Sequence, residues 1–397
     1  MSETCPPGPL LHSSVIEISE SALRTNLRFL REAIGPDVEL TSVIKGNAYG
    51  HGIGTIVPLA ERCGIRSFAV SHADEAYDAH RAMSATSRLV IMADVADEEF
   101  EWAIVHGVEL FVFDRERLAR AADTARRVAV PARLHLELET GMHRTGFDAA
   151  ELPSVAAFVR DHADALTVVG VCTHYAGAES VENYLRIQSQ IRAFEEGCAA
   201  LTRAGATLGQ RHTACSAAAL TYPETIMDRV RIGIAQYGFW PSEQTRMQWL
   251  LRQEARGTPR SNDPLRRVMK WKSRVMSLKS VAAGQFVGYG ITHLSTRPQR
   301  LAVVPVGYHH GFSRSLSNLG HVLILGRRAP VVGMVNMSMV TVDVTEIPEV
   351  RRGDEVVIIG RQKRGEITVG AFSDMTRDLN YEVLVRLPAS IPRVTVP

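Results

Sequence analysis

The chain has 397 residues, of which 45% are hydrophobic, so it is long enough for two domains with sizeable cores. Its 45 Lys and Arg residues nearly balance 43 Asp and Glu residues, which gives no reason to expect nucleic acid or an anionic membrane as a partner. The five cysteines are odd in number and form no close pair of the metal-binding type. This usage indicates a reducing compartment and argues against a disulfide framework.

The N-terminus lacks the pattern of an export signal, since residues 1–13 have no basic start followed by an apolar run. No stretch of the chain approaches the roughly 18 apolar residues that a membrane span needs. We therefore expect a cytoplasmic protein in which residues 1–13 form an N-terminal tail.

From residue 14 to residue 247, short apolar runs typical of strands alternate with amphipathic, helix-like segments. Eight strands alternating with helices predict an α/β fold, a TIM-like (β/α)8 barrel. An open, doubly wound parallel sheet is the alternative that this pattern leaves. The predicted strands are Glu39–Lys45, Ser67–Val70, Arg88–Met92, Glu109–Phe113, Arg133–Leu138, Thr167–Cys172, Gln210–Ala214 and Arg229–Gly233.

The pattern changes at residues 248–267, which are polar, contain turn-forming residues and are predicted to be an interdomain connection. Residues 268–397 then predict a mostly β C-terminal domain, with one helix at about Val369–Asp378. Its expected strands are Lys272–Val281, Arg300–Pro305, His321–Leu325, Pro330–Val335, Val340–Val344 and Glu355–Ile359.

A lysine ends the first predicted barrel strand and leads into a glycine-rich turn, Lys45 to Gly52. The carboxyl ends of barrel strands surround the active site, so a lysine at this point faces it. A partly desolvated lysine is suited to forming a Schiff base. For an isolated lysine, the alternative is a strand-end side chain that points into solvent.

The segment Lys-Gly-Asn-Ala-Tyr-Gly-His-Gly from Lys45 resembles the cofactor-lysine motif of the alanine racemase family, fold-type III pyridoxal-phosphate enzymes. Only Gly46 differs from the family motif, which has alanine there. The resemblance implies that Lys45 carries pyridoxal 5'-phosphate as a Schiff base and that Tyr49 contacts the phosphate.

Four further segments of the barrel resemble the same family, each at or just beyond the end of a predicted strand. The segment Thr140–Gly146 implies that Arg144 bonds the phenolic oxygen of the cofactor and helps hold the substrate carboxylate. The segment after the sixth strand implies that His174 lies beside the pyridine ring. The serine after the seventh strand, Ser216, is implied to bind phosphate.

The eighth strand carries the last barrel motif, which implies that Arg231 bonds the pyridine nitrogen and that the backbone of Gly233 and Ile234 binds phosphate. Because an arginine can only donate, the ring nitrogen would stay unprotonated. A shorter-lived carbanion would then favour return of the proton over transamination.

Segments of the C-terminal domain complete the resemblance. It implies that Tyr289 is the second base and comes from the partner subunit of a homodimer with shared active sites. Tyr308 would line the substrate entry, Met337 would lie at the substrate carboxylate, and Tyr381 would bind the phosphate. The sequence predicts no metal site.

Racemisation requires removal of the α-proton on one face and its return on the other, so two bases are needed. The resemblance assigns these roles to Lys45 and Tyr289 and implies interconversion of L- and D-alanine, an isomerase reaction of D-amino-acid metabolism that supplies D-alanine. The substrate would be a free amino acid.

Several positions depart from the family motifs. Glu137 stands where many members have a carbamylated lysine, and we hypothesise that its carboxylate orients Arg144 directly; the alternative is an ordinary strand-end carboxylate. Around the entry and carboxylate segments the departures are His143, Cys215, His309, His310, Asn336 and Ser338. They leave a racemase of broader or different specificity, for serine, lysine or arginine, as the alternative.

Three other classes of protein compete with a racemase. Non-catalytic pyridoxal-phosphate barrels lack a second β domain, and the decarboxylases that share this architecture have a glycine-rich phosphate loop that is not found here. A pure sensor would not need two facing bases.

Overall fold

The computed structural model describes residues 12–255, 257 and 263–397. It divides into two compact units, one comprising residues 21–48 and 53–266, and the other comprising residues 49–52, 267–397 and the chain up to residue 20. Most of the predicted tail, residues 1–11, lies outside the described residues, and so do residues 256 and 258–262 of the predicted connection. Among the described residues, no helix combines the length and apolar character needed to cross a membrane.

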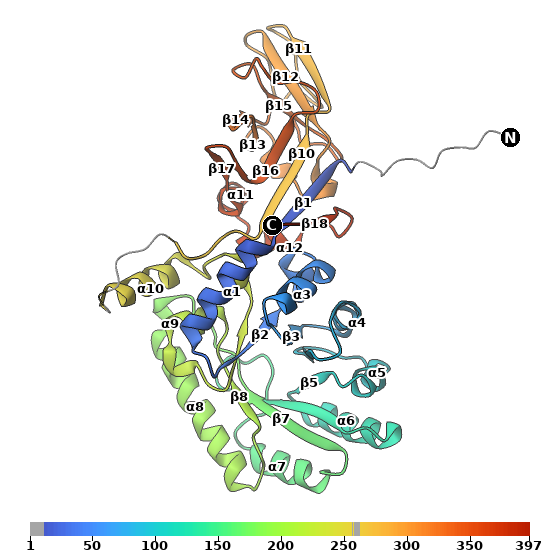
Figure 1. Cartoon of the computed structure of the whole chain (residues 1–397), viewed down its shortest axis with the longest axis vertical. Helices are drawn as coiled ribbons and strands as arrows, with labels where there is room; N and C mark the ends of the chain where they lie inside the picture. The colour runs from blue at the N-terminus through green and yellow to red at the C-terminus, as the bar shows by residue number, and fades with distance from the viewer. Residues whose placement is uncertain (1–11, 256, 258–262) are drawn as a thin grey trace, which may run out of the picture. The chain divides into compact units, whose positions relative to one another are not determined.

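The first unit contains an eight-stranded parallel sheet in the order β8-β7-β6-β5-β4-β3-β2-β9 (Figure 1). All eight strands predicted between residues 39 and 233 are present, so the (β/α)8 fold class is confirmed. Their bounds are β2 Glu39–Val43, β3 Ser67–Val70, β4 Arg88–Ile91, β5 Glu109–Val112, β6 Ala132–Glu137, β7 Leu166–Cys172, β8 Gln210–His212 and β9 Arg229–Ile232.

The sheet closes on itself, which decides against an open doubly wound sheet. Strand β2 pairs in parallel with β3 on one side and with β9, the last barrel strand, on the other. Between β8 and β9 the pairing is reduced to one parallel bridge between Cys215 and Arg231, where the Arg231 N–H donates to the Ala214 carbonyl at 2.9 Å. The result is a nearly closed barrel.

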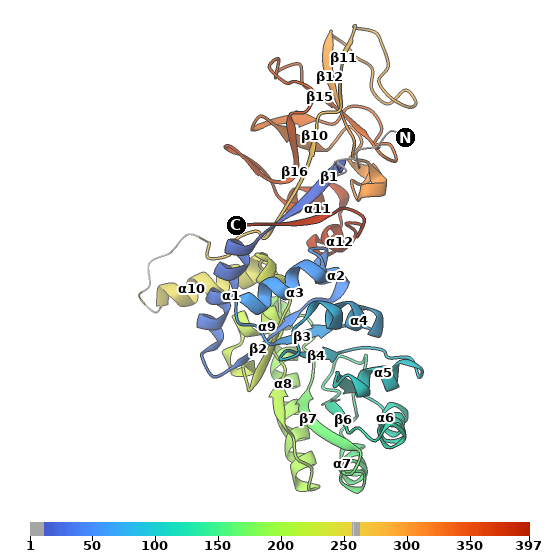
Figure 2. The ribbon, with the colours of Figure 1, turned by 45° about the vertical axis from the view of Figure 1, so that its right-hand side comes forward.

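Helices surround the barrel strands on the outside (Figures 1 and 2). Helix α1 is amphipathic, because Leu23, Leu27 and Leu30 recur at helical spacing and are buried. The helices are α1 Glu20–Ile34, α2 Lys45–Tyr49, α3 Ile53–Arg62, α4 Ala73–Ala82, α5 Glu99–Val105, α6 Arg115–Val128, α7 Leu152–Asp161, α8 Tyr184–Arg203, α9 Ser216–Thr221 and α10 Glu243–Ala255, with short 3-10 turns η1 Val181–Asn183, η2 Pro223–Thr225 and η3 Ile234–Tyr237.

Helix α10 occupies the first part of the stretch predicted to be a connection. Its residues up to Ala255 are good helix formers, and the first turn-forming residue is Gly257. The Trp249 ring packs edge-on against Phe29, with the ring centroids 5.5 Å apart. This aromatic contact docks a helix whose polar composition alone suggested a linker.

The second unit contains two antiparallel-rich sheets. A seven-stranded sheet has the order β14-β13-β16-β10-β1-β18, with β17 paired to β16, and a three-stranded sheet has the order β11-β12-β15. The strands are β1 Ser14–Ser19, β10 Met269–Arg274, β11 Ser277–Val281, β12 Gln299–Val304, β13 His321–Ile324, β14 Arg327–Pro330, β15 Val340–Asp343, β16 Glu355–Gln362, β17 Gly365–Ile367 and β18 Arg393–Val396. Helices α11 Val369–Thr376 and α12 Asn380–Val385, with 3-10 turns η4 Tyr308–His310 and η5 Arg314–Leu316, complete the unit.

Strand β1 belongs to this second unit, whereas the sequence analysis included residues from 14 onward in the barrel. It pairs antiparallel with β10 and parallel with β18. Its residues alternate between buried and half-buried positions, with Ile16 and Ile18 buried. That alternation is typical of a strand with one covered face, whereas β3 and β5 are buried throughout.

Two other strand predictions in this unit were wrong in their bounds. The run Lys272–Val281 divides into β10 and β11, which lie in different sheets. The run Pro330–Val335 is not a strand; β14 ends at Pro330, and Gly333 adopts a φ of 75° that interrupts an extended chain. The predicted helix near Val369–Asp378 is present as α11.

Candidate active site

Lys45 follows β2 directly and opens an unusual turn. Four consecutive residues after it, Gly46, Asn47, Ala48 and Tyr49, have φ values of 62°, 51°, 55° and 51°. Left-handed backbone costs about 1–2 kcal/mol for each residue other than glycine, so surrounding contacts must hold this turn. It redirects the chain immediately at the carboxyl end of a barrel strand.

Glu75, on helix α4, holds the start of this turn. Its carboxylate accepts hydrogen bonds from the N–H of Gly46 at 2.5 Å and from the N–H of Ser71, after β3, at 3.0 Å. The Asn47 side chain accepts from the Ile53 N–H at 2.9 Å and ties the end of the turn to helix α3. A half-buried carboxylate thus connects the ends of β2 and β3.

A second set of contacts fixes the end of β2 against β9. The fully buried Gln236 accepts from the Ser42 hydroxyl at 2.7 Å and donates to the carbonyls of Val43 and Ile232 at 3.0 Å each. The Tyr237 hydroxyl donates to the same Val43 carbonyl at 3.0 Å. Strands β2 and β9 are therefore held together at their carboxyl ends, next to Lys45.

Cationic side chains converge on Lys45. Partial burial and the charge of Arg144 lower the pKa of Lys45, with a further lowering from Arg231, while Glu75 opposes the shift. Burial together with Arg231, Arg144 and Lys45 lowers the pKa of His174 to about 3, so this imidazole is neutral. The strand ends of β2, β6, β7 and β9 thus bring together three cations and a neutral histidine.

The segment that carries Arg144 is held by Glu139. This carboxylate accepts hydrogen bonds from the backbone N–H groups of Gly141, Met142 (2.8 Å) and His143 (2.8 Å). Among the described residues, the Arg144 guanidinium forms no hydrogen bond or salt bridge, and its side chain is exposed. Arg144 is therefore available to a ligand.

The Arg231 guanidinium, in contrast, is almost fully engaged. Nη1 donates to His212 Nδ1 at 2.5 Å and to the His212 carbonyl at 2.7 Å, and Nη2 donates to the carbonyls of Thr173 at 2.7 Å and Thr213 at 3.3 Å. These bonds occupy the four hydrogens on the two Nη atoms. In the described part of the chain no partner is recorded for the fifth hydrogen, on Nε.

Ser216 lies where two short helical turns begin. It opens α9, and its Oγ accepts from the N–H groups of Gly233 at 3.0 Å and Ala235 at 3.5 Å at the start of η3. The N–H of Ile234 lies between these two groups in the chain. Hydroxyl and backbone N–H donors of this kind bind phosphate oxygens.

These donors fit an anionic ligand that carries both a phosphate and a ring. The residues at these strand ends offer an amine, two guanidinium groups with N–H donors left over, a neutral imidazole and a serine with adjacent N–H groups. The one buried carboxylate among them, Glu137, has a raised pKa, chiefly because of its burial. The chemistry of this donor set matches pyridoxal phosphate.

Comparisons with known proteins cover nearly the whole chain. Residues 18–241 match the model of the alanine racemase N-terminal domain, and residues 268–395 match that of the C-terminal domain. An alanine racemase from Leptospira interrogans is 35% identical over 387 residues, covering 97% of this chain and 96% of that protein. The crystal structure of an alanine racemase from Streptomyces lavendulae superposes with a TM-score of 0.87 at 30% identity, covering 98% of both chains.

The chain belongs to the alanine racemase family.

Within the alanine racemase fold, Glu137 departs from the hypothesis drawn from the sequence. Among the described residues it forms no salt bridge with Arg144; the charges of Arg231 and Arg144 only oppose the rise in its pKa that burial causes. A glutamate arm is shorter than that of a carbamylated lysine, which explains why the expected direct contact is absent. Glu137 and Arg144 therefore attract each other electrostatically without a salt bridge among the described residues.

The second unit carries the remaining residues that the family resemblance singled out. The rings of Tyr49 and Tyr381 lie together, with their centroids 5.9 Å apart, and Arg393 donates to the Gly50 carbonyl at 2.8 Å. A Cβ on Gly50 would lie 2.0 Å from the Leu384 carbonyl oxygen, so α12 packs directly on Gly50. The structure thus brings together two tyrosines that are 332 positions apart in the sequence.

Tyr289, Tyr308 and Met337 are exposed by 74%, 42% and 59% on loops of the second unit. The Tyr308 N–H donates to the Asn336 carbonyl at 3.0 Å, which joins two of these loops. The loop that carries Tyr289 adjoins the loop that carries Met337 at Gly333, where a Cβ would lie 2.7 Å from the Val287 carbonyl oxygen. The three side chains therefore lie on adjoining loops.

Sequence reasoning missed the residues that hold the site rather than face it: Glu75, Glu139, Gln190, Gln236, His135 and His212. Gln190 is an example, because it bonds Thr140 at 3.3 Å and the His174 carbonyl at 3.2 Å from a position in the middle of α8. The available signal was polar residues at positions that the amphipathic pattern assigns to the core.

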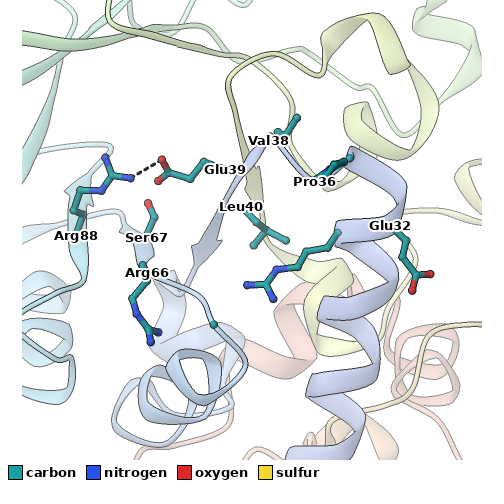
Figure 3. Close-up of a pocket in the computed structure, with 11 residues that line it drawn as sticks. Glu32, Pro36, Val38, Glu39, Leu40, Arg66, Ser67 and Arg88 are labelled. Atoms are coloured by element: carbon teal, nitrogen blue, oxygen red, sulfur yellow. Dashed lines mark hydrogen bonds and ion pairs between the residues drawn. The ribbon is translucent and has the colours of Figure 1, made fainter.

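A cavity of about 720 Å³ lies at the other end of the barrel strands, where β2, β3 and β4 begin (Figure 3). Its wall includes Arg66 and Ser67, and Glu39, whose carboxylate pairs with Arg88 at 2.5 Å. The amino ends of barrel strands serve stability rather than chemistry. We therefore place the active site at the Lys45 end, despite the cavity.

Proposed function

We propose that this chain is a pyridoxal-phosphate-dependent racemase that interconverts L- and D-alanine. The observation that carries the proposal is Lys45, held at the end of a barrel strand by a left-handed turn and surrounded by Arg144, Arg231 and neutral His174. The names of its relatives, alanine racemases from several bacteria, support alanine as the substrate.

We propose the following residues as those that would hold the cofactor. Lys45 would form the covalent link, Arg231 would offer its Nε–H to the ring nitrogen, and His174 would lie beside the ring. Ser216, the N–H of Ile234 and the hydroxyls of Tyr49 and Tyr381 would bind the phosphate, and the N–H of Gly233 would join them if it exchanged its bond to Ser216 Oγ for one to phosphate. Bound pyridoxal phosphate withdraws electrons from the α-carbon of an attached amino acid and thereby makes its proton acidic.

Lys45 moves the α-proton on one face of the substrate. Its lowered pKa favours the neutral amine that this task requires. Arg144, whose guanidinium has no partner among the described residues, binds the substrate carboxylate together with Met337. Neutral His174 adds no charge to the ring environment, and the arginine at the ring nitrogen donates without giving up a proton.

Tyr289 of the partner subunit serves the opposite face. Tyr289 is 74% exposed, next to Ile291, which is 79% exposed, and Met337 and Tyr308 are exposed on adjoining loops. Apolar side chains gathered in this way mark an interaction surface. A second copy of the chain, covering these loops, gives a homodimer in which each subunit completes the other's active site.

The test is to incubate the purified protein and pyridoxal phosphate with L-alanine in D2O and to measure both enantiomers and their deuterium content. We expect D-alanine to form and both enantiomers to carry deuterium. Lys45→Ala should abolish the reaction. Tyr289→Phe should slow interconversion by several orders of magnitude while leaving the cofactor attached to Lys45, as read by borohydride reduction and intact mass.

The same assay with L-serine, L-lysine and L-arginine addresses specificity. His309 and His310 lie at the entry segment, and Asn336 and Ser338 flank Met337, where the family motifs have other residues. Conversion of alanine above the others supports the proposal. Conversion mainly of serine or a basic amino acid would transfer the proposal to that substrate, and no conversion of any amino acid would refute it.

A further inference from the structure

Ionisable side chains fill part of the barrel interior, where apolar residues would be expected. Because successive side chains of a strand point to opposite faces, one residue in two faces inward. Strands β5, β6, β8 and β9 contribute Glu109, His135, His212 and Arg231, which are exposed by 1%, 0%, 1% and 5% respectively. None of the first three contains an atom that the proposed reaction uses.

These four side chains form one continuous chain of hydrogen bonds. Arg231 Nη1 lies 2.5 Å from His212 Nδ1, and His212 Nε2 lies 2.8 Å from His135 Nδ1. His135 Nε2 in turn lies 2.9 Å from the Glu109 carboxylate. The chain leads from the amino end of β5 to the arginine at the carboxyl end of β9.

The direction of the hydrogens follows from Arg231, because arginine can only donate. Arg229 Nη1 also lies 3.4 Å from His135 Nε2, but it lies closer, at 3.2 Å, to the Glu109 carboxylate, and we assign its hydrogen to that carboxylate. His212 Nδ1 must accept from Arg231, so its hydrogen is on Nε2. That hydrogen is donated to His135 Nδ1, which places the hydrogen of His135 on Nε2 as well. The Glu109 carboxylate accepts it and ends the chain.

The ionisation states agree with this direction. Burial lowers the pKa of His212 and of His135, with added lowering from Arg231, so both imidazoles are neutral. Burial alone would raise the pKa of Glu109, but the hydrogen bond from His135 and the charge of Arg229 outweigh it and keep that pKa well below its usual range. One anion and one cation are thus linked through two neutral rings.

The surrounding residues are arranged to accommodate the chain. Arg229 anchors Glu109 at 3.2 Å and also pairs with Glu39 at 2.9 Å. Gly170 on β7 leaves room for His135, since a Cβ there would lie 2.3 Å from His135 Nδ1. Burying such groups costs several kcal/mol unless each is fully hydrogen-bonded, so a purely structural core would be better served by apolar side chains.

We propose that Glu109, His135 and His212 are positioning residues that hold the Arg231 guanidinium in one orientation by fixing both histidines as Nε2–H tautomers. The bonds from the two Nη atoms to His212, Thr173 and Thr213 leave only the Nε–H to face a ligand. If His212 carried its hydrogen on Nδ1, two donors would oppose each other and the guanidinium would have to move. The role at the ring nitrogen rests on the proposed function, whereas the tautomers belong to the protein alone.

Neutron diffraction from crystals of the cofactor-free protein tests the tautomers directly. We expect deuterium on Nε2 and none on Nδ1 of both His135 and His212. Deuterium on Nδ1 of either ring would overturn the proposal, whatever reaction the protein catalyses.

A pair of variants tests the effect on Arg231. The amide oxygen of His135→Asn can still accept from His212, whereas His135→Leu leaves the His212 Nε2–H without an acceptor. We expect His135→Leu to lower kcat at least 10-fold relative to His135→Asn, with little change in KM. In the protein loaded with 15N-pyridoxal phosphate, the ring-nitrogen signal should shift in His135→Leu and stay near the wild-type position in His135→Asn.

His162→Gln is the control, because this histidine stacks on Phe158 at the end of α7, away from the chain of hydrogen bonds. Equal kcat and ring-nitrogen signals in the two folded His135 variants would overturn the proposal. If His135→Leu does not fold, the proposal is decided by the neutron result and by whether the ring-nitrogen signal of His135→Asn stays at the wild-type position. A wild-type protein without racemase activity but with the expected tautomers would refute the proposed function and leave the hydrogen-bond direction intact.

Discussion

Removing Glu75 should loosen the turn that presents Lys45. Asn47, Ala48 and Tyr49 are left-handed, which together costs about 3–6 kcal/mol. The two bonds that Glu75 accepts, from Gly46 and Ser71, have an ionised acceptor, so each contributes about 1.5–3 kcal/mol. Because Glu75 is only half-buried, we take the lower end and expect Glu75→Ala to lower the free energy of unfolding by about 3 kcal/mol.

Urea unfolding of the cofactor-free protein measures this loss. Glu75→Gln keeps one acceptor oxygen and should lose about half as much. The matched control is Asp74→Asn, which neutralises the exposed neighbouring acid on the same helix and should change stability by only a few tenths of a kcal/mol. A Glu75→Ala protein as stable as the Asp74→Asn protein would refute the view that Glu75 holds the turn.

The same variants should alter Lys45 itself. Burial and Arg144 lower the pKa of Lys45, whereas the Glu75 charge raises it, so Glu75→Gln should lower this pKa further. The pH dependence of borohydride trapping of pyridoxal phosphate on Lys45, followed by intact mass, reports it. We expect the midpoint in Glu75→Gln to move to lower pH, while a midpoint unchanged or moved to higher pH would contradict the electrostatic reasoning.

Three further predictions concern packing, protonation and assembly. Gly170→Ala should cost about 1–3 kcal/mol in urea unfolding by displacing His135, whereas Gly54→Ala, with open space around its Cβ, should not destabilise. His174 has its pKa lowered from 6.5 to about 3, so below pH 6.5 the unfolded chain binds a proton that the native protein does not. The free energy of unfolding should therefore fall by about 2–3 kcal/mol between pH 6.5 and 4.5 because of this group. His174→Gln should remove that part of the pH dependence. An unchanged pH dependence in His174→Gln would show that His174 is not the source. Ile291→Glu should dissociate the proposed homodimer in sedimentation experiments while the equally exposed Leu185→Glu, on α8, should not, and a dimer that survives Ile291→Glu would place the interface elsewhere.

The candidate site divides into residues that sequence could find and residues that it could not. Lys45 and Arg231 lie at the ends of predicted strands, and Arg144, His174 and Ser216 come within a few residues after predicted strands. Closure of the barrel brings the ends of those strands into one ring. Glu75 and Gln190 lie within helices, where a polar residue at an inward-facing position can be noticed but its partner cannot be inferred from the sequence. Their roles depend on which loop each helix packs against.

Strand β1 illustrates the same limit for the fold. Its alternation of buried residues is visible in the sequence, but alternation shows which face is covered and not which sheet covers it. The docking of α10 through Trp249 likewise depended on partners more than 200 positions away.

The sequence by itself determined the eight barrel strands, the mostly β character of the C-terminal domain and the lysine motif, because each depends on local periodicity or on adjacent residues. Alternation in β6 also placed His135 and Glu137 on the same face. Only the tertiary structure decided that His135 meets His212 and Glu109, and that Glu137 forms no salt bridge with Arg144 among the described residues. Hydrogen bonds require specific atoms within about 3 Å of each other, and strand order, barrel closure and register fix those distances.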